Sequence, residues 1–222
     1  SAADSLLTMA KETDPRVRLE SFKTLRIVGS SAQLPSLIEL LKNAPSQAES
    51  KELEKTVAAV ANKIEDKNQR TSEVTAAMET AKDASAKSSL IGVLGRIGTS
   101  GALAAVRSTM NDKDEKVLEA VIRTLSDWAN TEPMEDLLLL AQNSPDKKHQ
   151  VLALRGYIRL VGLESDRPAK ETIRLYMRAM SIAPSANEKK AVLAGLSGVK
   201  SYEAIEVAAG FLNDEQLGAE AA

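Results

Sequence analysis

The stretch "RIVGSSAQLPSLIELL", residues 26–41, joins the end of one apolar helix to the start of another across a break at Gly29-Ser30-Ser31. Farther along the chain, "RIGTSGALAAVRSTM", residues 96–110, presents the same features in the same order. A break that recurs between similar helices indicates an internal repeat. An internal repeat determines the fold class, so it is considered before any single residue.

Apolar residues precede each such break at helical spacing, as Val28, Leu25 and Phe22 precede Gly29. This spacing places the apolar side chains on one face of a helix. Taking the break as an anchor, successive anchors lie 31 to 38 residues apart, at Gly29, Glu65, Gly98, Ala129, Gly162 and Lys200. A shorter apolar helix is expected after each anchor, over 34–42, 71–82, 101–110, 132–142, 168–182 and 202–212.

The composition favours closely packed helices. The 222 residues are 43% hydrophobic but only 3% aromatic, so the core is built from Leu, Ala, Val and Ile. Ala and Leu are strong helix formers, whereas strands favour aromatic and β-branched residues. There is no cysteine, which excludes disulfides and thiolate metal sites. The net charge of −2 argues against attraction to nucleic acid or anionic membranes.

Local signals predict where the helices begin and end. Asp14-Pro15 and Ser144-Pro145 each place a capping side chain before a proline suited to the first helical position. Capping boxes are predicted at 46–49 and 185–188. Left-handed residues that end a helix are expected at Gly29, Gly98 and Gly162. We therefore expect an all-α chain of about fourteen helices in antiparallel pairs.

Three segments carry a family resemblance. "DPRVRLESFKTLRIVG", residues 14–29, resembles the second helix of a HEAT repeat, and residues 114–129 and 146–162 are similar but lack the arginine after the valine. The resemblance implies a HEAT-like solenoid, a right-handed α-α superhelix of six to seven antiparallel helix pairs that forms a single domain over 1–222. It also implies a concave surface lined by the helices that end at the anchors, here called the inner helices.

The resemblance has implications for the cellular context as well. Residues 166–212 are similar to the tail of HEAT arrays in exported bacterial multidomain proteins, some joined to sugar-processing domains. This likeness implies a soluble bacterial protein that is exported or periplasmic, with the cytoplasm left open. Because the sequence starts at Ser1 without a methionine, we interpret it as part of a longer protein.

Signals for chemistry are sparse. His149 is the only histidine, so no zinc set is recognisable, and we expect it on a helix surface in the "KKHQ" cluster. The glycines of 92–101 lack the Gly-Lys-Ser/Thr of a phosphate loop and are expected to allow close helix packing. Asp127 and Trp128 raise the alternative of a HEAT-like DNA glycosylase or lyase, but Trp128 is at a core position and has no second tryptophan beside it.

A cationic stripe stands out from the repeat alignment. Positions three, six, ten and thirteen before each anchor are expected to face the concave surface. Eight cations and two anions, Glu52 and Glu119, occupy them, a net charge of +6. The cations are Arg16, Lys23, Arg26, Lys55, Lys116, Arg123, Arg159 and Lys190. Small residues also lie on the stripe and are expected to let an extended ligand approach, namely Gly92, Gly95, Gly156, Ala59 and Ala194.

The sequence thus predicts a non-catalytic scaffold that holds a protein, a peptide or an adjoining domain of the parent chain along its concave face. The net charge of the stripe favours an acidic partner. Arg26, Arg123 and Arg159 are the best candidates for contact because arginine pairs bidentately with carboxylate or phosphate. An ordinary solvated helix face is the competing interpretation of the stripe. The functional alternatives are a HEAT-like enzyme and an accessory module of an exported sugar-processing protein. No cofactor, metal, nucleic acid or membrane insertion is expected.

Overall fold

The computed structural model describes residues 2–222, and all regular structure in that range is helical, which confirms the all-α class. The first seven helices are α1 (Ala2–Met9), α2 (Pro15–Val28), α3 (Leu34–Lys42), α4 (Gln47–Ala61), α5 (Ser72–Thr80), α6 (Ala84–Ile97) and α7 (Ser100–Arg107). They are followed by α8 (Glu115–Ser126), α9 (Met134–Asn143), α10 (Lys147–Val161), α11 (Ala169–Ile182), α12 (Ala186–Ser197), α13 (Tyr202–Ala209) and α14 (Gly218–Ala221). A 3-10 turn at Ser31–Gln33 precedes α3.

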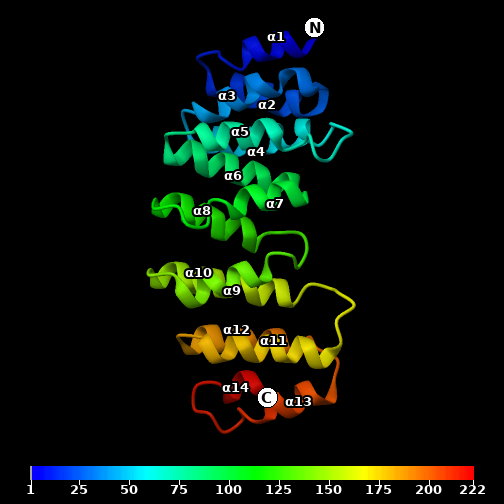
Figure 1. The fold of residues 1–222 in the computed structure, drawn as a ribbon, viewed down its shortest axis with the longest axis vertical. Coiled ribbons are helices and arrows are strands. Elements are labelled where there is room, and N and C mark those ends of the chain that lie inside the picture. Colours follow the sequence, from blue (N-terminus) through cyan, green and yellow to red (C-terminus); the bar gives the residue numbers. More distant parts are fainter. Residues whose placement is uncertain (1) are drawn as a thin grey trace. The chain divides into compact units, whose positions relative to one another are not determined.

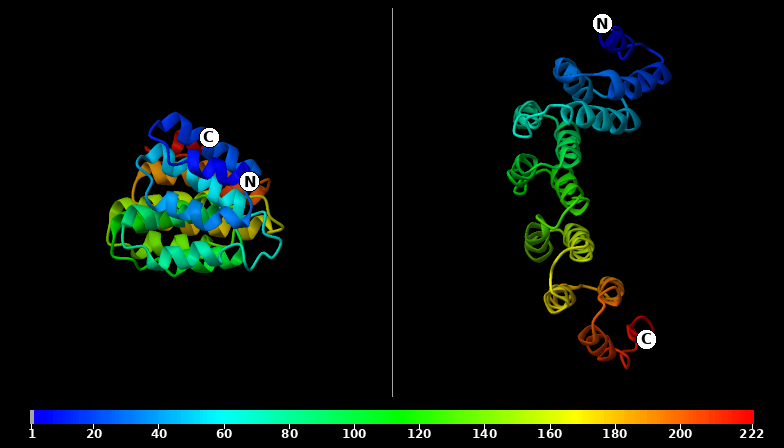
Figure 2. Two further views of the ribbon diagram at one scale, coloured as in Figure 1. Left: turned by 90° about the horizontal axis from the view of Figure 1, so that it is seen from above. Right: turned by 90° about the vertical axis from the view of Figure 1, so that its right-hand side faces the viewer.

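The chain divides into two compact units, and the division falls between Thr124 and Leu125. In the first unit the helices form two layers (Figures 1 and 2). Inner helix α2 packs on α4, and α4 packs on α6, while outer helix α3 packs on α5. Each of α4 and α6 also packs against the outer helix that precedes it in the chain. This arrangement of stacked antiparallel pairs is the one predicted for a helical repeat array.

The second unit is built in the same way. The pair α9 and α10 is followed by the pair α11 and α12, and inner helix α10 packs on α12. The outer helix α11 contacts both α9 and α13 (Figure 1). Each pair thus buries its apolar face against the next pair rather than in a shared centre. The single domain and the right-handed superhelix expected for the whole chain stay predictions.

The apolar stripe of the inner helices is buried as the repeat predicts. The residue four positions before each anchor has at most 8% of its surface exposed, at Leu25, Ala61, Leu94, Leu125, Ile158 and Leu196. The residue directly before the anchor varies more: Val28, the last residue of α2, is 49% exposed, whereas Trp128, two residues beyond α8, is 2% exposed, in agreement with its expected core position. No helix in the range 2–222 is both long and apolar enough to cross a membrane.

Most of the predicted helix starts are confirmed, with one exception. Asp14 accepts from the backbone N–H of Arg16 at 2.8 Å, and Pro15 is the first residue of α2. The prediction for Ser144-Pro145 is wrong. Ser144 follows the last residue of α9, and Asp146 caps α10 by accepting from Lys148 N–H at 2.7 Å. An aspartate two residues farther on competes for the same role, and its carboxylate is the stronger acceptor.

Only one of the three anchor glycines is left-handed. Gly98 ends α6 with φ of 67°, as predicted. The expectation is wrong for Gly29, where φ is −66°, and for Gly162, where φ is −76°. Gly29 is needed for space instead, since a Cβ there would lie 2.5 Å from the carbonyl oxygen of Leu25 and 3.1 Å from Cγ2 of Val60 on the next inner helix. The glycine at this helix end is therefore explained first by its own last turn and then by the close approach of the next repeat.

Candidate interaction surface

The eight predicted contact residues are divided between the two units. The six that belong to the first unit are Arg16, Lys23 and Arg26 on α2, Lys55 on α4, and Lys116 and Arg123 on α8. Arg159 on α10 and Lys190 on α12 belong to the second unit. Arg26 and Lys190 are half-buried, and the other six are exposed. The structure therefore places most of the stripe at the surface.

Several of these cations are already neutralised by neighbouring carboxylates. Glu52 on α4 is buried and contacts both Arg26 of α2 and Nζ of Lys55, the latter at 3.2 Å. Lys23 pairs within α2 with Glu20 at 2.7 Å. Arg123 pairs within α8, where Nη2 is 2.7 Å from Oε1 of Glu119. Glu52 and Glu119 are already counted in the net charge of +6, so only Glu20 lowers it further, but the pairs occupy four of the eight cations with partners inside the first unit.

Arg159 has a structural role. Its Nη1 donates to the carbonyl oxygens of Ser126 at 2.8 Å and Trp128 at 3.1 Å, which lie at the end of α8. In the first unit, Nζ of Lys63 likewise donates to the carbonyls of Ile27 at 2.6 Å and Gly29 at 2.7 Å, at the end of α2. In both cases a cation from one repeat caps the preceding inner helix, whose last carbonyls lack helical partners.

Three of the small residues of the stripe, Gly92, Gly95 and Gly156, are used for helix packing, whereas Ala194 is exposed. A Cβ on Gly92 would lie 3.1 Å from Oε2 of Glu54, and one on Gly95 would lie 2.5 Å from Cγ2 of Thr124. In the second unit a Cβ on Gly156 would lie 1.9 Å from Oγ of Ser126. Side chains of the adjacent inner helices thus occupy the space above these glycines, so the close packing expected for the glycines of 92–101 is confirmed.

An open groove of about 720 Å³ crosses α4, α6 and α8 in the first unit. We call it the serine groove because it is lined by Ser46, Ser50, Ser85, Ser88 and Ser89. Its wall also contains Lys51, Lys116 and Arg123, with the carboxylates Glu54 and Glu119 between them. Of the predicted contact residues, Lys116 and Arg123 are therefore brought together here.

Hydrogen bonds across the serine groove link the three inner helices. The hydroxyls of Ser50 on α4 and Ser89 on α6 are 2.7 Å apart. Nζ of Lys116 on α8 donates to Oγ of Ser85 on α6 at 3.2 Å, and Ser88 donates to the Lys116 carbonyl at 3.3 Å. These contacts hold the lysine beside the groove without neutralising its charge.

Glu54 is the titratable group of the groove with the most burial. It lies on α4, where burial raises the pKa of its carboxyl above the ordinary value of 4.5, opposed by the charge of Arg96. Nε of Arg96 is 3.8 Å from Oε2 of Glu54. The folded protein thus favours the neutral carboxyl more than water does.

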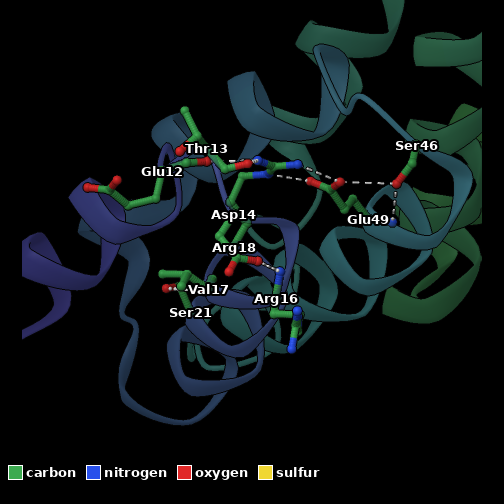
Figure 3. Close-up of polar contacts among 9 residues, drawn as sticks. All are labelled: Glu12, Thr13, Asp14, Arg16, Val17, Arg18, Ser21, Ser46 and Glu49. Carbon is green, nitrogen blue, oxygen red and sulfur yellow. Dashed lines mark hydrogen bonds and ion pairs between the residues drawn. The ribbon is translucent and has the colours of Figure 1, made fainter.

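A second hollow, of about 750 Å³, lies between the turn after α1 and helices α3 and α4. Figure 3 shows Arg18, which lines it, between two sets of acceptors. Nη1 donates to the carbonyls of Glu12 and Thr13, at 2.7 and 2.8 Å, while Nε and Nη2 donate to the Glu49 carboxylate. All the contacts of Arg18 are therefore structural.

The sequence pattern predicts Glu49 only as part of a capping box and does not predict its pairing with Arg18. Ser46 caps α4 as predicted, since its Oγ accepts from Glu49 N–H at 3.3 Å, but Glu49 does not complete the box by accepting from Ser46 N–H. The carboxylate accepts from Ser46 Oγ at 3.1 Å and from Arg18, so it serves two repeats at once. The signal that could have found this pair is a capping-box glutamate about one repeat after an arginine.

The predicted surface position of His149 is wrong. It was expected on a helix surface, but it is 2% exposed in α10. It falls on the face of α10 that packs within the second unit, which a polar neighbourhood in sequence does not reveal. Across residues 2–222, no group of three or more His, Cys, Asp or Glu side chains is placed to hold a metal ion.

These features define a class of protein made of stacked antiparallel helix pairs. Residues 71–158 match the family model described as HEAT repeats, so the resemblance predicted from the sequence is confirmed in this central segment. No curated protein was found to match the chain. The exported location implied by residues 166–212 stays a prediction.

Proposed function

We propose that the chain is a non-catalytic scaffold that holds a protein partner, and that the serine groove of the first unit is its contact surface. HEAT repeats generally mediate protein interactions, which supports the scaffold role. The observation that carries the proposal is a groove of about 720 Å³ that stays open across three successive inner helices. Two of the predicted contact residues, Lys116 and Arg123, line it.

The charges of the groove favour an acidic partner. Lys116 donates to a serine hydroxyl, and neither it nor Lys51 forms an ion pair within residues 2–222. Arg123 already pairs with Glu119, so the two lysines are the better candidates for contact with a carboxylate. Such cations at the rim of an interface contribute mainly to the association rate and to specificity.

The hydroxyls of the groove support binding rather than catalysis. A serine nucleophile is commonly activated by a histidine base within hydrogen-bonding distance. The single histidine of the chain, His149, belongs to the second unit. Each hydroxyl oxygen has two lone pairs, so the serines keep acceptor capacity beyond their internal hydrogen bonds and are assigned as acceptors for the backbone N–H groups of a bound peptide.

A labelled peptide of alternating Glu and Ala, with a Lys/Ala peptide as its counterpart, tests this proposal by fluorescence anisotropy. We expect the acidic peptide to bind, and the double variant Lys51→Glu/Lys116→Glu to weaken binding by about tenfold. The matched control is Lys67→Glu/Lys82→Glu, since both of these exposed lysines lie outside the groove. Equal weakening by the two double variants would contradict the proposal.

A further inference from the structure

Helix α13 of the second unit exposes an unusual amount of apolar surface. Tyr202 is 74% exposed and Ile205 is 65% exposed, and Leu212, just beyond the helix, is 48% exposed. Ala204 faces the other way and is 3% exposed, and α13 packs against α11 and α12. The helix thus has one face packed in its unit and one apolar face in solvent.

The exposed residues within the helix form a single stripe. Positions 202, 205 and 209 are spaced by three and four residues, which places them on one side of α13, and Leu212 lies in the turn that follows the helix. Elsewhere in this unit, outer helix α11 contacts the helices on either side of it, α9 and α13. If α13 follows the same packing, another helix can pack against its free side.

The segment that carries the stripe has only negatively charged side chains, and exposed Lys200 directly precedes it. Residues 201–222 contain no Lys or Arg and five carboxylates, all exposed, at Glu203, Glu206, Asp214, Glu215 and Glu220. None of the five forms an ion pair within residues 2–222. An acidic rim disfavours an anionic membrane surface, and it disfavours the same face of a second copy because like charges would meet.

We propose that the exposed face of α13, defined by Tyr202, Ile205 and Leu212, is a docking site for an amphipathic helix of a partner protein with Lys or Arg beside its apolar face. The apolar stripe supplies the area to be buried, and the five carboxylates select the charge of the partner. This surface is separate from the serine groove, and the two are expected to bind partners of opposite charge.

The test uses the 222-residue chain and two labelled helical peptides that share one leucine face, one with lysines and one with glutamates on the other face. Because the serine groove is itself proposed to bind acidic peptides, all measurements are made in the Lys51→Glu/Lys116→Glu background, where fluorescence anisotropy is expected to show binding of the lysine peptide alone. Ile205→Asp should weaken it by about tenfold or more, because the variant places a charge in the buried centre of the interface. Leu139→Asp is the matched control, since Leu139, like Ile205, is a large apolar residue exposed in the second unit, at 53%.

A second variant tests the charge selection. Glu203→Lys/Glu206→Lys should reverse the preference toward the glutamate peptide, and thermal unfolding followed by circular dichroism should show that all variants fold. Equal binding of both peptides, unchanged binding to Ile205→Asp, or equal weakening by Leu139→Asp would each overturn the proposal. So would a doubling of mass in light scattering that Ile205→Asp abolishes, because that result would assign the face to a second copy. Failure of the acidic peptide at the serine groove has no bearing on these outcomes.

Discussion

Arg18 on α2 and Glu49 on α4 form a two-point ion pair between adjacent repeats, with Nε 2.8 Å from Oε2 and Nη2 2.9 Å from Oε1. The second unit repeats the device, since Nη2 of Arg155 on α10 is 2.6 Å from Oε1 of Glu188 on α12. Both glutamates are 3% exposed, and each accepts a hydrogen bond from the hydroxyl of the serine that caps its own helix, Ser46 or Ser185. A residue that starts one inner helix thus also fixes that helix to the preceding one.

The first prediction concerns the pH dependence of Glu49. The hydrogen bond from Arg18 lowers the pKa of this carboxyl below its ordinary value of 4.5, and burial opposes the effect. The stabilisation is therefore present above about pH 4.5 and is lost as the pH falls through the lower pKa of the folded state. Glu49→Gln should reduce stability at pH 7 and make it fall less between pH 7 and pH 3. Urea unfolding at both pH values measures this difference, and parallel losses in the two proteins would contradict it.

Glu54 should show the opposite sign. Burial raises the pKa of its carboxyl because the ionised form is destabilised in the folded protein. Stability is therefore lost as the pH rises from 4.5 through the higher pKa of the folded state. Glu54→Gln should therefore be neutral or stabilising at pH 7, in contrast to Glu49→Gln. Arg96, the ion-pair partner, has a side chain that is 46% exposed and keeps its hydration when the charge is removed. A loss of stability at pH 7 as large as that of Glu49→Gln would show that the ion pair dominates.

Glycine substitutions test the contact between inner helices. In Gly156→Ala the new Cβ would lie 2.6 Å from Cβ of Ser126, so one helix has to move. We expect a loss of about 1–3 kcal/mol in the free energy of unfolding, as for other overpacked sites. Gly92→Ala is the comparison, because its Cβ would meet the flexible end of Glu54 and alanine favours the helix by about 0.5–1 kcal/mol. If chemical denaturation shows that Gly156→Ala and Gly92→Ala change the free energy of unfolding equally, close helix packing does not explain why these positions are glycine.

Arg159 distinguishes a capping role from a binding role. Because its guanidinium caps the end of α8, Arg159→Met should lower the stability of the protein by about 1 kcal/mol. The variant should leave the affinity for the acidic peptide unchanged, since Arg159 is not in the serine groove. Thermal unfolding and anisotropy on the same samples check the two parts. Unchanged stability together with weaker binding would restore Arg159 to the list of contact residues.

Much of the fold could be predicted from the sequence. The helix expected over 34–42 is observed as Leu34–Lys42, and the helix expected over 168–182 is observed as Ala169–Ile182. Helix periodicity depends on neighbours three and four residues away, so it can be read from one segment alone. The same locality explains why the buried position four before each anchor was found in all six repeats.

The candidate surface was predicted less well, for a physical reason. The stripe contained Lys116 and Arg123, which line the serine groove, but Arg26 and Arg159 were also named among the best candidates for contact. Arg26 is neutralised by Glu52 of the next inner helix, and Arg159 caps the helix before its own. Such pairs join residues that are about one repeat apart, and no local pattern records them.

The sequence by itself determined the repeat, the positions of the helices and the face of each inner helix that is buried, because each of these follows from the order of residues along one helix. Only the tertiary structure decided which charges remain available to a partner. That depends on the rotation and register of one helix against the next, which bring Glu49 to Arg18 and Glu52 to Arg26, and leave Lys51 and Lys116 beside an open groove.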